Sequence, residues 1–155
     1  MGRMYPHPRY AVPNKVDALL SYVDGSYSLG NGTTAGKVNI TVPLNDQDLG
    51  FTIEGRRYNK APGAGTAIIA DICSCTALTD LSATQYCKVL LYLVAAGTGA
   101  IVKGTNGTSQ ALAPMPELPV GGSALGWLEA GPSTDWDNAG GMAGQNVAYR
   151  MGIYM

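Results

Sequence analysis

Charged side chains are scarce in this 155-residue sequence. Only 14% of the residues are charged, with 10 Lys and Arg against 11 Asp and Glu, whereas globular proteins average about 25%. A chain with net charge close to zero has little electrostatic repulsion and tends to associate. Phosphate binding needs clustered Lys and Arg, and Arg56-Arg57 is the only adjacent basic pair. We therefore expect no nucleic-acid partner, and either a protein that is poorly soluble alone or a surface that other subunits cover.

Long apolar runs and a cysteine framework are also missing. No apolar run approaches the roughly 18 residues of a membrane span, and residues 1 to 6 lack the apolar region of a signal peptide. These absences predict no membrane partner and synthesis in a cytoplasm. The three cysteines are an odd number, and Cys73 and Cys75 are too close for a zinc knuckle. We expect them to be small buried apolar side chains.

The chain has a single histidine, His7, on a proline-rich segment. A serine or cysteine nucleophile activated by histidine is therefore not easily assembled. Asp135 and Asp137, beside Trp136, are the one place where acids and an aromatic ring meet in a Gly-rich stretch, and with Glu129 they define a hydrolase hypothesis. We favour a solvated turn with Trp136 packed underneath, and we expect no enzymatic activity.

Metal binding also lacks a recognisable pattern. Asp46, Asp48 and Glu54 offer carboxylates, but the spacing of an EF-hand loop is absent. The sequence therefore predicts neither a metal nor another cofactor.

Most of the chain consists of short apolar runs separated by turn residues, which is typical of a β-sandwich or barrel. Residues 38 to 42 alternate between apolar and polar, and residues 51 to 58 have the pattern of a hairpin around Gly55. Further strands are expected at residues 66 to 75, 86 to 94, 100 to 103 and 120 to 130. A Gly-, Ser- and Asn-rich stretch at residues 25 to 36 is expected to be a loop.

The two ends of the chain have a different character. Residues 1 to 13 contain Pro6, Pro8 and Pro13, which predict an extended arm. Residues 14 to 155 are then a single β domain, with a Gly-rich loop at 132 to 144 and a C-terminal strand or arm at 147 to 155. The spacing of apolar residues predicts one short helix at residues 16 to 23.

The middle of the chain resembles small virion proteins of tailed bacteriophages. The likeness lies in the order of a hairpin around a small Gly turn, a strand ending in Tyr-Cys-Lys-type residues, an Ala-Ala-Gly-Thr-type turn and a Leu-Pro-containing link into a last strand. The residues that carry it are 51 to 60, 85 to 97, 101 to 104, 115 to 119 and 126 to 129. Within that group, the size and β pattern look most like capsid decoration, or cement, proteins.

The resemblance implies a jelly-roll-like fold, a homotrimer and a position on the outer surface of the capsid. The partner that it implies is the major capsid protein, whose subunits the chain would bridge and stabilise. Tyr and Arg are enriched at interface hot spots, and a proline-rich arm loses little conformational freedom when it docks. The residues expected to contact partners are therefore those of the two terminal segments: Arg3, Tyr5, His7, Arg9, Tyr10, Tyr149 and Tyr154.

A tail or fibre component remains the alternative. In that setting Trp127, Trp136 and tyrosines would form a platform for a glycan or another receptor, because aromatic faces suit sugar rings. The Gly-rich stretch at residues 132 to 144 fits a tail or fibre protein as well as a head protein.

Overall fold

The computed structural model describes residues 21 to 137 and 146 to 151, and within these ranges the protein is mainly β, as the sequence predicts. The described residues form ten strands and no helix: β1 Tyr22–Val23, β2 Ser28–Asn31, β3 Lys37–Thr41, β4 Leu49–Ile53, β5 Arg56–Lys60, β6 Ile68–Ser74, β7 Cys87–Val94, β8 Gly99–Lys103, β9 Gly122–Ala130 and β10 Val147–Arg150. The described chain thus contains no helix suited to crossing a membrane.

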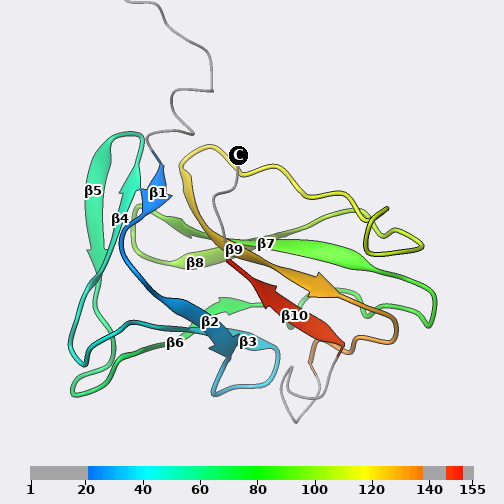
Figure 1. Ribbon diagram of the computed structural model, residues 1–155, viewed down its shortest axis with the longest axis horizontal. Helices are drawn as coiled ribbons and strands as arrows, with labels where there is room; N and C mark the ends of the chain where they lie inside the picture. The colour runs from blue at the N-terminus through cyan, green and yellow to red at the C-terminus, as the bar shows by residue number, and fades with distance from the viewer. Residues whose placement is uncertain (1–20, 138–145, 152–155) are drawn as a thin grey trace, which may run out of the picture.

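Three antiparallel sheets make up the sandwich (Figure 1). The largest has the order β10-β9-β7-β8, the second β2-β3-β6 and the third β1-β4-β5. The hairpins at 49 to 60 and 87 to 103 lie where the sequence predicts them, with Gly55 and Gly97 at positive φ in their turns. Glycine adopts that conformation without steric cost.

Two close approaches between strands bring the first two sheets together along both edges. At one edge the thiol of Cys73 in β6 donates a hydrogen bond to the carbonyl oxygen of Ala100 in β8, at 3.6 Å. Gly99 allows this approach, because a Cβ there would collide with the backbone of Ile72. At the other edge the hydroxyl of Tyr149 in β10 donates to Oδ1 of Asn31 in β2, at 2.6 Å. The third sheet lies against β9 through β1 and β4.

Apolar and polar side chains alternate along the strands, so that each sheet has an apolar face, and these faces pack together in a common core. The core residues include Val38, Ile40, Phe51, Leu91, Leu128 and all three cysteines. The Phe51 ring stacks on that of Tyr58 in the neighbouring strand, with centroids 5.5 Å apart. The expectation that the cysteines are buried apolar residues is confirmed.

The other face of the largest sheet also buries an apolar residue. Leu90 is fully buried but does not belong to the main core cluster, and it pairs with Trp127 of β9. The proline-containing connection between β8 and β9 lies near this part of the sheet, since Gly104 sits beside the backbone oxygens of Lys88 and Pro114. Ala113 in that connection is buried as well.

Two predictions of local structure are wrong. Residues 25 to 36 contain strand β2, which pairs with β3, instead of forming only a loop. The predicted short helix is absent: Tyr22 and Val23 at its C-terminal end form β1 and pair with Thr52 and Phe51, and residues 16 to 20 lie outside the described residues. The predicted arm at 1 to 13, most of the Gly-rich loop at 132 to 144 and residues 152 to 155 also lie outside them.

Candidate functional site

The residues predicted to contact partners fall mostly outside the described part of the chain. Arg3, Tyr5, His7, Arg9, Tyr10 and Tyr154 belong to the terminal segments that the structure does not describe. Tyr149 is described, and its half-buried hydroxyl bonds to Asn31. Burial raises the pKa of this hydroxyl above its ordinary value. Tyr149 therefore ties β10 to β2 within the domain.

Three carboxylates meet at the loop that follows β9. Oxygen atoms of Asp80, Asp135 and Asp137 lie within 4.8 Å of one another. A hydrogen bond with Asp135, followed by repulsion from its charge, raises the pKa of Asp137. Asp80 accepts a hydrogen bond from the backbone N–H of Trp136 at 3.0 Å. The sequence indicated two of these acids; Asp80 is 55 residues earlier, and no spacing pattern connects it to them.

The acidic residues belong to a polar turn that packs over the buried indole ring of Trp136. Trp136 is fully buried, and its Nε1 donates to the carbonyl oxygen of Thr79 at 3.2 Å. This confirms that Trp136 packs beneath a polar turn, and it removes Trp136 from any surface platform for sugars. Asp46, Asp48 and Glu54 form no such group among the described residues; Asp46 instead accepts a hydrogen bond from the backbone N–H of Gly65 at 2.6 Å.

The three thiols are held in their protonated form. Burial raises the pKa of Cys73 and of Cys75 to about 12, and burial also raises the pKa of Cys87. A thiolate is the nucleophilic form of cysteine. At neutral pH these side chains therefore act as core residues.

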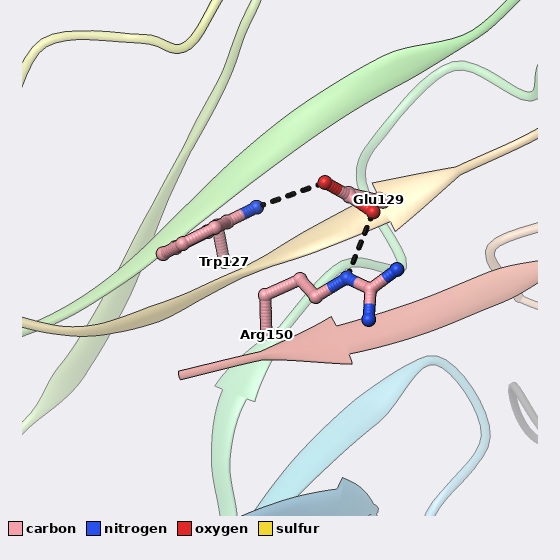
Figure 2. A network of polar contacts seen from close by, with 3 residues as sticks. All are labelled: Trp127, Glu129 and Arg150. Atoms are coloured by element: carbon pink, nitrogen blue, oxygen red, sulfur yellow. Dashed lines mark hydrogen bonds and ion pairs between the residues drawn. The ribbon is translucent and has the colours of Figure 1, made fainter. Parts of the chain in front are cut away.

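A polar network lies on the outer face of the largest sheet (Figure 2). The carboxylate of Glu129 in β9 reaches toward its neighbours on both sides: it accepts a hydrogen bond from Nε of Arg150 at 2.9 Å and a longer one from the indole Nε1 of Trp127 at 3.4 Å. Burial acts to raise the pKa of Glu129, but the bonds from Arg150 and Trp127 outweigh it and the pKa is lowered. Glu129 is therefore ionised at neutral pH and paired with a cation.

The surface is hollowed beside this network. The hollow encloses about 320 Å³ between the connection that follows β8, the C-terminal end of β9 and the start of β10; Tyr86, Gln110, Glu129, Gly131 and Asn146 line it. We call it the Gln110 hollow. Its volume lies at the lower end of the roughly 300–1,000 Å³ typical of small-molecule sites.

The side chain of Gln110 contains a polar atom without a hydrogen-bond partner among the described residues. This atom, Nε2, is buried, so it does not open onto the hollow. Gly131 gives room to the carboxamide of Asn146, because a Cβ at position 131 would collide with that side chain. Sequence reasoning missed this site, since its residues are scattered over 63 positions, from Tyr86 to Ala148, and form no motif.

The fold and these sites define an antiparallel β-sandwich with a polar surface hollow and a protonated, unreactive set of thiols. In comparisons with protein-family models, with curated proteins and with solved structures, no match to the chain was found.

Proposed function

We propose that the protein is a structural subunit of a bacteriophage particle that binds the major capsid protein and stabilises the shell. The proposal rests on the resemblance of five segments between residues 51 and 129 to small virion proteins and on the low charge of the chain. In this setting it acts on the outer surface of the capsid, as a homotrimer and without a cofactor, after synthesis in the host cytoplasm.

The geometric observation that supports the proposal concerns the two ends of the described chain. Strand β1 lies against β9, and Arg150 at the end of β10 pairs with Trp127 of β9. The described chain therefore begins and ends beside the same strand. Tyr22 and Met151 at these points are 50% and 43% exposed. Exposed apolar side chains next to both terminal segments suit a docking surface that includes them.

The experiment compares two full-length variants for binding to shells assembled from the major capsid protein. One carries Ala at Arg3, Tyr5, His7, Arg9 and Tyr10. The control carries Ala at three exposed loop residues, Asn45, Gln47 and Asp48. Because a hot-spot side chain contributes more than about 1 kcal/mol, we expect the first variant to lose binding at least a hundredfold and the control to bind normally.

Thermal unfolding of both variants separates a binding defect from a folding defect. We expect unchanged melting temperatures, since none of the substituted residues belongs to a strand that the structure describes. Normal decoration of shells by the first variant would contradict the role of the N-terminal segment.

A further inference from the structure

We propose that residues 114 to 120 form a polyproline ridge that docks into an apolar groove of the binding partner, lined by aromatic rings and a Lys or Arg. These residues, Pro-Met-Pro-Glu-Leu-Pro-Val, lie in the connection that leads from β8 into β9 (Figure 1). The inference rests on the proposed function, because the partner in question is the major capsid protein. It adds a contact made by the described domain to those of the terminal segments.

The backbone of the polyproline ridge is extended. Its residues form no helix or strand, and none of them has a positive φ. Pro114, Pro116 and Pro119 have their φ fixed at about −65° by the ring. Each proline also keeps the residue before it out of the helical region. The segment therefore has the backbone of a polyproline helix, which repeats about every three residues.

Burial along the ridge follows this three-residue repeat. Positions 113, 116 and 119 are buried or half-buried, positions 114, 117 and 120 are exposed, and positions 115 and 118 are half-buried. Pro116 lies against Gly104, which follows β8, since a Cβ at position 104 would approach Cδ of Pro116 to 3.3 Å. One row of side chains thus anchors the ridge to the domain, and another row faces outward.

The outward row is suited to a groove in another protein. Val120 at its end is 90% exposed, and Leu112, just before the ridge, is 69% exposed. Polyproline ligands dock in aromatic-lined grooves, and their side chains lie on one row at intervals of about three residues. Because prolines already restrict the backbone of the ridge, docking costs little conformational entropy.

Glu117 determines the charge that the groove should carry. It is the only charged residue of the ridge, it lies in the middle of the outward row, and it takes part in no salt bridge among the described residues. A Lys or Arg at the rim of the groove would complement its charge, whereas a carboxylate would repel it. The groove is therefore expected to be apolar with a basic rim.

The first test measures cosedimentation of full-length variants with shells assembled from the major capsid protein. We expect Val120→Ser to bind about tenfold more weakly, as for one contact residue of an interface. The matched control is Leu44→Ser, since Leu44 is 68% exposed in the loop after β3; it should bind as the unchanged protein does. Equal binding of Val120→Ser and the unchanged protein would overturn the proposal.

A second pair of variants tests the charge. Glu117→Lys places a cation opposite the expected basic rim, so we expect binding to fall about tenfold or more. Asp48→Lys makes a comparable change at an exposed residue outside the ridge and should leave binding unchanged. Tighter or unchanged binding of Glu117→Lys would show that no basic group faces Glu117, which contradicts the proposed groove.

Crosslinking identifies what covers the ridge. With Val120→benzoylphenylalanine bound to shells, illumination should attach the ridge to a segment of the major capsid protein that contains aromatic residues. Attachment to a second copy of the chain would mean that the ridge is a contact between copies, and the proposal would be wrong. Failure of the unchanged protein to bind shells would instead contradict the proposed function, and with it the partner named here.

Discussion

Asp71 shows how one side chain can hold two parts of a sheet together. It lies in β6 at a φ of 52°, where the register between β3 and β6 shifts. The shift directs its carboxylate to the turn between β2 and β3, where it accepts hydrogen bonds from the backbone N–H groups of Thr33 and Thr34 and from the Thr34 hydroxyl. Gly32 makes room for the carboxylate, since a Cβ there would lie 2.6 Å from Oδ1 of Asp71.

These bonds make stability depend on pH in a defined direction. The hydrogen bond from the Thr34 side chain is the largest cause that lowers the pKa of Asp71 in the folded protein. The ionised carboxylate therefore stabilises the fold above the ordinary Asp pKa of about 3.9, and this contribution is lost as the pH falls through the lowered folded value.

The substitution Asp71→Asn tests this account. Asn also tolerates positive φ, so the backbone is retained while the charge is lost. We expect the free energy of unfolding at pH 7 to fall by about 1 kcal/mol. Buried hydrogen bonds to charged groups contribute more than this, but the Asp71 site is partly exposed. Urea unfolding at pH 7 and pH 3 measures the difference, which should shrink at pH 3. A constant difference at both pH values would exclude the ionised carboxylate as its cause.

At the scale of elements, the packing of β9 against β10 and β2 depends on Gly126. Its φ is +146°, and it lies where the β7–β9 register shifts. A Cβ at this position would collide with the backbone oxygen of Arg150 and approach Cδ1 of Leu29 to 2.9 Å. The residue therefore has to be glycine for β9 to meet both neighbours.

Gly126→Ala should therefore be strongly destabilising. A non-glycine residue in such a backbone conformation costs about 1–3 kcal/mol, and the collision with backbone adds to this. We expect a loss of about 3 kcal/mol or more in the free energy of unfolding. The matched control is Gly30→Ala in β2, where a Cβ meets nothing within 4 Å. Similar stabilities of the two variants in urea would contradict the role given to Gly126.

Most strands could be predicted from the sequence, and the exceptions have physical reasons. The alternation of Val38, Ile40 and Val42 and the apolar run of β7 identify buried strands directly. Strand β2 was missed because its residues resemble a turn and Leu29 is its only large apolar side chain; pairing with β3 overrides that local preference. The spacing of apolar residues at 16 to 23 suggested a helix. At Tyr22 and Val23 the chain instead pairs with β4 as a strand.

The candidate sites were less predictable than the strands. Asp135 and Asp137 attract attention because they flank a tryptophan, but only the fold brings Asp80 to them. The Gln110 hollow joins residues from four separate parts of the chain, so no local spacing reveals it. Gln110 becomes noticeable once the fold shows that its Nε2 is buried without a partner in the described part of the chain.

At the scale of the whole molecule, closure of the sheets limits where another chain can add a strand. The sheets β10-β9-β7-β8 and β2-β3-β6 approach each other at both edges, through β6 with β8 and β2 with β10. Strand β5 forms an edge of the third sheet, and it carries Arg56, Arg57 and Lys60. Charged side chains on an edge strand oppose strand addition. Partners are therefore expected to dock through side chains and the terminal segments.

The most direct test of the proposed structural role is the copy number of the protein in phage particles purified from cultures that carry its gene, measured by quantitative mass spectrometry. A protein that bridges capsid subunits across the shell must be present in numbers comparable to the major capsid protein, and this is the result we predict. Absence from purified particles, or the few copies expected of a tail or fibre component, would contradict the proposal.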